Sequence, residues 1–180
     1  MQVTEVAAIA EVRAGRTDAF RTLVDRHTRT IYRLAYRMTR NESDADDVVQ
    51  EAFLRAYRNL ESFDARASFG TWLYRIATNV ALDLIKKRQR DAEEPIGDTD
   101  LPTRAAATDD AVLMRVGLSD ALDRGMRLLS GNERTAFVLR HYEGRSIDEI
   151  SSVLGTPESA TKHTIFRAVR KLRQVLEPLV

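Results

Sequence analysis

The chain has 180 residues, 43% of them hydrophobic and 31% charged, with a net charge of +1, no cysteine, eight glycines and four prolines. The absence of cysteine excludes disulfides and thiolate metal sites, and the scarcity of turn-forming residues disfavours an all-β chain. No apolar run approaches the roughly 20 residues that a membrane span needs. We therefore expect a soluble, helical, cytoplasmic protein.

The charges are distributed unevenly along the chain. Residues 1–90 carry 16 basic and 12 acidic side chains, residues 91–112 carry 1 and 7, and residues 113–180 carry 11 and 8. The middle segment contains two prolines and a glycine and has no apolar period, which is typical of a flexible linker. The sequence thus predicts two basic modules, 1–90 and 113–180, that are joined by an acidic linker and can share a polyanionic partner.

The first module is predicted to begin with amphipathic helices. Apolar residues recur every three or four positions over residues 20–38, and Asp18 is placed to cap this helix. A second amphipathic helix is expected over about 44–60, with Ser43 and Asp46 as its capping box. Both patterns predict helices with one face in a shared core.

Acidic side chains crowd the first turns of the 44–60 helix. They are Asp44, Asp46, Asp47 and Glu51, with Gln50 among them. Acids at a helix N-terminus suit the helix dipole, which explains them without any function. A carboxylate metal site of a helical enzyme is the alternative, but no second acidic motif or phosphate-binding loop accompanies it. His141 and His163 give no metal-ligand spacing either, so we expect no metal or other cofactor.

The run 62–90 combines an aromatic-flanked loop with a long basic helix. Phe63 and Phe69 bound the loop, and Trp72 begins an apolar stripe that repeats every four residues as far as Leu84. The helix ends in four basic side chains at positions 86, 87, 88 and 90. Such side chains suit a helix C-terminus. Beside this loop they also indicate a surface that holds a nucleic-acid backbone and stacks or pockets a base.

The second module has the pattern of a helix-turn-helix. Capping boxes at 130–133 and 146–149 predict a helix through Tyr142 and then a short helix, and Gly155 suits the position after that short helix. Thr156 and Pro157 then begin a longer basic helix. Its inner side is predicted to comprise Ala160, Ile165, Ala168, Val169 and Leu172, with Val175 or Leu176. A short helix, a glycine-containing turn and a longer basic helix are the elements that read a DNA groove.

Three stretches resemble conserved parts of bacterial sigma factors. DADDVVQEAFLRAYRNLESF and FGTWLYRIATNVALDLIKKR resemble region 2, most of all that of the small extracytoplasmic-function (ECF) group. LSGNERTAFVLRHYEGRSIDEISSVLGTPESATKHTIFRAVRKLR resembles region 4. Together they cover nearly the whole chain in the expected order. The resemblance implies an all-α fold of two small helical domains joined by a flexible acidic linker, the C-terminal one a helix-turn-helix.

The resemblance also implies a function and partners. A sigma factor is not itself an enzyme. It binds core RNA polymerase, through the β′ clamp helices and the β flap, and directs it to promoter DNA. It recognises the −35 and −10 elements and helps to melt the −10 element. Family members are commonly held inactive by an anti-sigma factor, so we expect one here.

Site residues follow from the resemblance position by position. Those implied at the core-polymerase contact are Asp46, Asp47, Gln50, Glu51 and Phe53. Those implied at the −10 element are Phe63, Asp64, Ser68, Phe69, Arg75, Asn79, Lys86 and Lys87. Those implied at the −35 element are Lys162, His163, Phe166, Arg167 and Arg170. Residues 159–164 read SATKHT where the family commonly has Gly-Thr-Val-Lys-Ser-Arg, so the −35 sequence itself stays open.

One further alternative remains at this point. A conventional helix-turn-helix regulator would use its N-terminal helices to sense a ligand or to dimerise. Such a sensor would not need the basic and aromatic stretch at 63–90, which therefore favours the sigma-factor interpretation.

Overall fold

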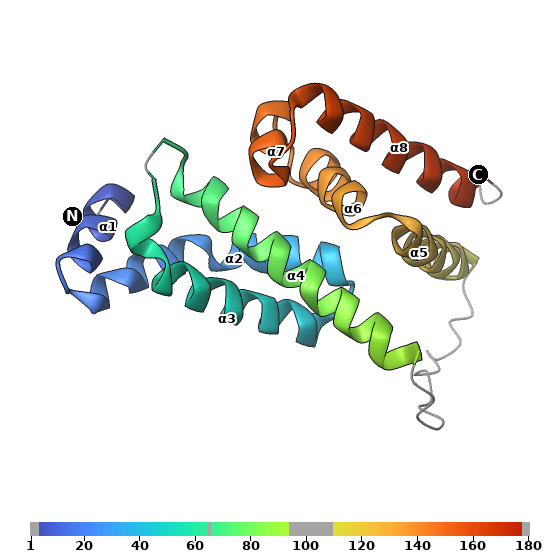
Figure 1. The fold of residues 1–180 in the computed structure, drawn as a ribbon. Helices are drawn as coiled ribbons and strands as arrows, with labels where there is room; N and C mark the ends of the chain where they lie inside the picture. The colour runs from blue at the N-terminus through green and yellow to red at the C-terminus, as the bar shows by residue number, and fades with distance from the viewer. Residues whose placement is uncertain (1–3, 65, 94–109, 178–180) are drawn as a thin grey trace.

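The computed structural model describes residues 4–64, 66–93 and 110–177, and every regular element within them is helical (Figure 1). The N-terminal half comprises α1 (Glu5–Arg13), η1 (Thr17–Ala19), α2 (Phe20–Thr39), α3 (Glu42–Arg58), η2 (Leu60–Ser62) and α4 (Phe69–Glu93). The C-terminal half comprises α5 (Asp110–Leu128), α6 (Gly131–Phe137), the π-helical turn η3 (Val138–Tyr142), α7 (Ile147–Leu154) and α8 (Glu158–Leu176). The all-α fold class is confirmed. Residues 94–109 of the expected linker lie outside the described residues.

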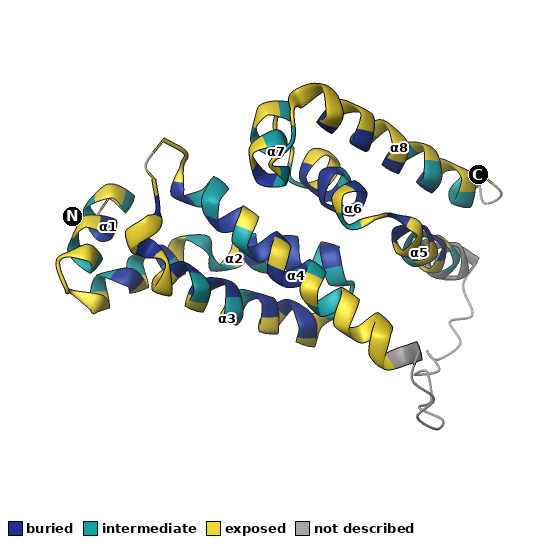
Figure 2. Cartoon of the chain, viewed as in Figure 1, coloured by how far each residue is buried: buried dark blue, intermediate teal, exposed yellow. Residues whose placement is uncertain are grey.

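The core of the N-terminal half lies between α2, α3 and α4. Its fully buried side chains include Leu23, Ile31, Leu34 and Met38 of α2, Val48, Ala52 and Ala56 of α3, and Leu73, Ala77 and Ala81 of α4. These residues recur at helical spacing on each element, so each helix contributes one stripe to a common interior. Residues 86–91 of α4 extend beyond this core and are exposed (Figure 2).

Two helix starts differ from the sequence prediction. Asn41, not Ser43, caps α3, since its side chain accepts a hydrogen bond from the Asp44 backbone at 2.9 Å. Asp18 does not cap α2, because residues 17–19 already form a helical turn that runs directly into it. An earlier start of α3 also buries Asp44, whose carboxylate lies 2.5 Å from Arg88 of α4. Asp44 is therefore a structural ion-pair partner, although burial raises its pKa above the ordinary aspartate value.

The C-terminal half packs α8 against α5, α6 and α7. Both predicted capping boxes are present, Ser130 with Glu133 and Ser146 with Glu149. Gly155 ends α7 in the left-handed conformation with φ +64°, which a glycine adopts without steric cost. The inner side of α8 differs from the prediction at one point: Ala160 is exposed, whereas Thr161 and Thr164 are buried.

Both threonines remain hydrogen-bonded in their buried positions. Thr161 donates to the Pro157 carbonyl at 3.1 Å, and Thr164 donates to the Ala160 carbonyl at 2.9 Å. Because the preceding turn of the helix accepts each hydroxyl, a threonine can replace an apolar residue on the inner face.

The two halves pack against each other, whereas the flexible linker expected from the sequence left their relative placement open. α7 lies beside the N-terminal part of α4 (Figure 1), and η3 lies against α2. Arg40 at the end of α2 pairs with Asp123 of α5 at 2.6 Å and donates to Ser119 at 3.2 Å. Arg134 of α6 donates to the Met38 carbonyl at 3.3 Å. No local pattern in the sequence indicates any of these contacts.

Candidate nucleic-acid and polymerase interfaces

The helix-turn-helix presents one face of α8 to solvent. The five residues expected to read the −35 element are all exposed there: Lys162, His163, Phe166, Arg167 and Arg170. Phe166 is 65% exposed, which is unusual for a phenylalanine and leaves its ring available to a partner. The buried residues Thr161, Thr164, Ala168 and Leu172 fix the opposite face. The exposed face is therefore rigidly oriented, as a helix that enters a major groove must be.

Glu133 of α6 forms ion pairs with two basic side chains of α8. Its side chain is 5% exposed and lies 2.7 Å from Nζ of Lys171 and 3.6 Å from Nε of Arg167. Burial disfavours the charged carboxylate, but hydrogen bonds from Lys171 and from the Ser130 backbone outweigh it, so the pKa of Glu133 lies below the ordinary glutamate value. An ionised Glu133 thus ties the capping box of α6 to the basic face of α8.

An aromatic cluster supports the loop before α4. Phe63 and Phe69 are buried, and their rings lie 5.1 and 5.7 Å from the ring of Trp72, centroid to centroid. Asp64 and Ser68 are exposed between them. Ser68 also starts α4, because its hydroxyl accepts a hydrogen bond from the Thr71 backbone at 3.1 Å. The aromatic rings therefore form the floor of the loop, and the polar residues form its rim.

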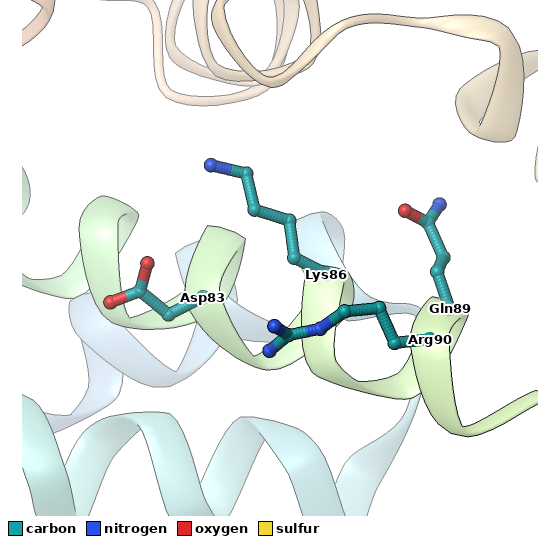
Figure 3. Close-up of a pocket in the computed structure, with 4 residues that line it drawn as sticks. All are labelled: Asp83, Lys86, Gln89 and Arg90. Carbon is teal, nitrogen blue, oxygen red and sulfur yellow. The ribbon is translucent and has the colours of Figure 1, made fainter.

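The exposed face of α4 continues from this loop toward the basic end of the helix. Arg75, Asn79, Lys86 and Lys87 are all exposed. Near the end of the helix, a hollow of about 460 Å³ is lined by Asp83, Lys86, Gln89 and Arg90 (Figure 3). Lys86 extends away from the helix, whereas Arg90 lies back along it toward Asp83. Cations spaced along one helix in this way suit the phosphates of a nucleic-acid strand.

The start of α3 forms an acidic surface. Asp46, Asp47 and Gln50 are exposed, and Glu51 pairs with Arg55 at 2.6 Å. Phe53, in contrast, is only 7% exposed and packs edge-on against Phe20 in the core, at 6.4 Å between ring centroids. The polar residues can meet a partner directly, whereas Phe53 supports the helix from the interior.

The acidic residues do not gather into a metal site. Within the described residues, no three His, Cys, Asp or Glu side chains are placed to hold a metal ion. Glu51 turns toward Arg55, which in turn lies 3.6 Å from Asp83 of α4. The described helices also include none that is long and apolar enough to cross a membrane.

Comparison with known proteins identifies the family. The model of sigma-70 region 2 matches residues 23–91, and that of sigma-70 region 4 matches residues 119–172. The chain is 37% identical to the ECF RNA polymerase sigma factor SigW of Bacillus subtilis, over 95% of this chain and 96% of SigW. The chain belongs to the ECF sigma-factor family. A second ECF relative, the sigma-E factor of Haemophilus influenzae, is 32% identical over 99% of this chain and 98% of its own.

Two solved structures have a similar fold. The structure of CnrH in complex with the cytosolic domain of CnrY is similar with a TM-score of 0.67 and 30% identity, covering 95% of this chain and 96% of that one. The sigma factor RpoE of Bartonella quintana, solved with the anti-sigma factor NepR, has a TM-score of 0.61 at 20% identity, over 88% and 96% of the two chains. The second similarity concerns the fold alone.

Proposed function

We propose that this ECF sigma factor binds core RNA polymerase and directs promoter-specific initiation of transcription. The observation that carries this function is the similarity to SigW over nearly the full length of both chains. A sigma factor supplies promoter specificity to the polymerase and is not an enzyme. The region 2 match at 23–91 also occupies the part of the chain that a sensor domain would need in a conventional regulator, so that alternative is set aside.

Each interface is assigned to one exposed surface. The exposed face of α8 reads the −35 element as duplex, since a helix with a fixed inner side can present Lys162 and Arg167 to a major groove. The loop 63–69 and the exposed face of α4 hold the opened −10 strand, because a loop rim over an aromatic floor can receive an extruded base. The acidic start of α3 binds the β′ clamp helices, with Asp46, Asp47, Gln50 and Glu51 as the contact.

The division of the chain follows these surfaces. We place the −10 and polymerase-binding domain at 1–90, the linker at 91–112 and the −35-binding domain at 113–180. The ranges of the two family matches support this division, although α4 continues to Glu93 and α5 begins at Asp110. The partners are core RNA polymerase, including its β flap, and promoter DNA. An anti-sigma factor is a further partner, and the protein acts in the cytoplasm, where bacterial polymerase works.

Run-off transcription with core polymerase on a promoter library tests the function. The parent protein should select one pair of −35 and −10 sequences.

Variants test each interface separately. Lys162→Ala with Arg167→Ala should relax selection of the −35 sequence, whereas Asn79→Ala should relax only selection of the −10 sequence. Loss of one base contact costs about 1–3 kcal/mol. Asp47→Arg should weaken core binding without unfolding the chain. Arg173→Ala on α8 and Asp25→Arg on α2 are exposed controls. Unselective transcription by the parent would refute the function.

A further inference from the structure

The Glu143 side chain fills a cradle of hydrogen-bond donors between the two halves. It lies in the turn between η3 and α7, and its side chain is 3% exposed. Its carboxylate pairs with Arg37 of α2 and lies 3.8 Å from Arg33, one turn earlier. The Tyr74 hydroxyl of α4 donates to the same carboxylate at 3.2 Å. Three donors from the N-terminal half thus surround one anion from the C-terminal half.

The cradle has the chemistry of a phosphate site. Two guanidinium groups and the phenol O–H donate toward the anion, and arginine forks match the oxygens of phosphate as well as those of a carboxylate. Burial raises the pKa of Tyr74 above the ordinary tyrosine value, so its hydroxyl keeps the proton that it donates. Arg33 remains 51% exposed even in this closed form, in which the two halves are packed together. One side of the cradle is therefore in contact with solvent.

The surrounding contact between the halves leaves some buried polar atoms without a hydrogen bond. Among the described residues, Thr78 Oγ1 and Arg145 Nε are buried without a hydrogen-bond partner. Thr78 follows Tyr74 by one turn of α4, and the Arg145 guanidinium lies over the Tyr74 ring at 4.4 Å. A buried polar atom without a partner costs free energy that separation of the halves would recover. Separation of the halves would therefore let water satisfy both atoms.

We propose that Arg33, Arg37 and Tyr74 form a binding site for a backbone phosphate of single-stranded DNA, which Glu143 occupies while the two halves are packed together. This inference rests on the proposed function, because it is the −10 strand held on α4 that would reach the site. Arg75 directly follows Tyr74 on α4, and Asn79 lies about one turn beyond it, so the cradle borders the proposed −10 surface. Strand binding and domain packing then compete for the same donors.

Oligonucleotide binding by the full chain tests the site. The probe is a fluorescent single strand of mixed sequence, on the order of 15 nucleotides long, followed by anisotropy at several salt concentrations. Glu143→Gln should raise the affinity severalfold and steepen the log–log salt dependence by about 0.7 for the one phosphate gained. Arg37→Ala or Tyr74→Phe in that background should return both values toward the parent. Asp25→Asn and Arg21→Ala, an exposed pair on α2, give the matching charge changes as controls.

A distance measurement separates binding from opening. Because the chain has no cysteine, Arg58→Cys on α3 and Gln174→Cys on α8 place two labels for energy transfer at exposed positions. The oligonucleotide should lower the transfer in the parent, and Glu143→Gln should lower it without DNA. An opened Glu143→Gln protein with parental affinity and salt dependence would overturn the proposal. So would equal competition by an acidic peptide, which would assign the cradle to a protein partner.

The same proteins show which hypothesis fails, the proposed function or the phosphate site. Promoter-directed run-off transcription reports on the proposed function, whereas oligonucleotide affinity and energy transfer report on the cradle. If transcription is selective but Arg37→Ala leaves strand binding unchanged in the Glu143→Gln background, only the phosphate site is refuted.

Discussion

Arg134 shows how one buried cation can organise backbone from both halves. It is 6% exposed, and its guanidinium donates to the Met126 carbonyl at 2.6 and 3.1 Å and to the Met38 carbonyl at 3.3 Å. Burial lowers its pKa below the ordinary arginine value, and the charge of Arg127 adds to this effect. The helix pattern alone would place Arg134 on a solvated surface, and no local signal in the sequence indicates its partners, one of which lies 96 residues away.

Replacing Arg134 should therefore destabilise the protein. Arg134→Met keeps most of the side-chain volume but removes all three donated hydrogen bonds, and a buried carbonyl that loses its donor costs about 1–3 kcal/mol. The free energy of unfolding, measured in urea, should fall by that amount. Arg124→Met, at an exposed site of α5, should change it by less than about 0.5 kcal/mol. Equal stability of the two variants would mean that the Arg134 hydrogen bonds are replaced by water.

At the scale of elements, the features that depend on residues close together in the sequence were predicted best. The capping boxes at Ser130 and Ser146 were predicted correctly because both partners of each box lie within four residues of sequence. The start of α3 was predicted wrongly, because Asn41 and Ser43 are both good capping residues and the ion pair between Asp44 and α4 favours the earlier start. Which face of α8 is buried was also mispredicted in part, since threonine hydroxyls can be satisfied within their own helix.

The packing of α5 against α8 leads to a prediction with a built-in control. A Cβ added at Gly125 would lie 2.7 Å from Leu172 Cδ2, whereas one added at Gly117 would have no neighbour within 4 Å. Gly117→Ala should stabilise the protein by about 0.5–1 kcal/mol through helix propensity alone. Gly125→Ala should destabilise it by about 1–3 kcal/mol, because α8 must shift.

Thermal unfolding of both glycine variants measures the difference. The two substitutions add the same methyl group to the same helix, so intrinsic propensity cancels between them. If Gly125→Ala were also stabilising, α5 and α8 would not be in contact in solution.

At the scale of the whole molecule, the sequence predicted two modules and their order but not their contact. The apolar stripe that begins at Trp72 was recognised, whereas the neighbouring positions Tyr74, Thr78 and Leu82 were not. These residues recur every four positions on a further face of α4, and Leu82 lies against Gly131 of α6. This second stripe on α4 was the available sign in the sequence that a further element packs there. Which element packs on it could not be inferred, because contacts across the two modules join residues far apart in the chain.

Reversing one charge should separate the halves. Arg40 and Asp123 are about two-thirds buried and joined at 2.6 Å, so Asp123→Lys replaces an attraction of about 1 kcal/mol with a repulsion. The radius of gyration from small-angle scattering should rise, and a single unfolding transition should split into two. Asp120→Lys, exposed on the same helix, is the matched control. An unchanged radius for Asp123→Lys would show that the remaining contacts suffice to hold the closed form.

The aromatic floor of the loop has a practical consequence. Trp72 is the only tryptophan in the chain, and it lies within 6 Å of two phenylalanine rings beneath the loop. Its ultraviolet emission therefore comes from one place, at the start of α4, while the C-terminal half has no indole. A base entering the loop would change the polarity around this indole or quench it. The protein thus carries a native spectroscopic probe of strand capture, which needs no dye and does not report on duplex binding by α8.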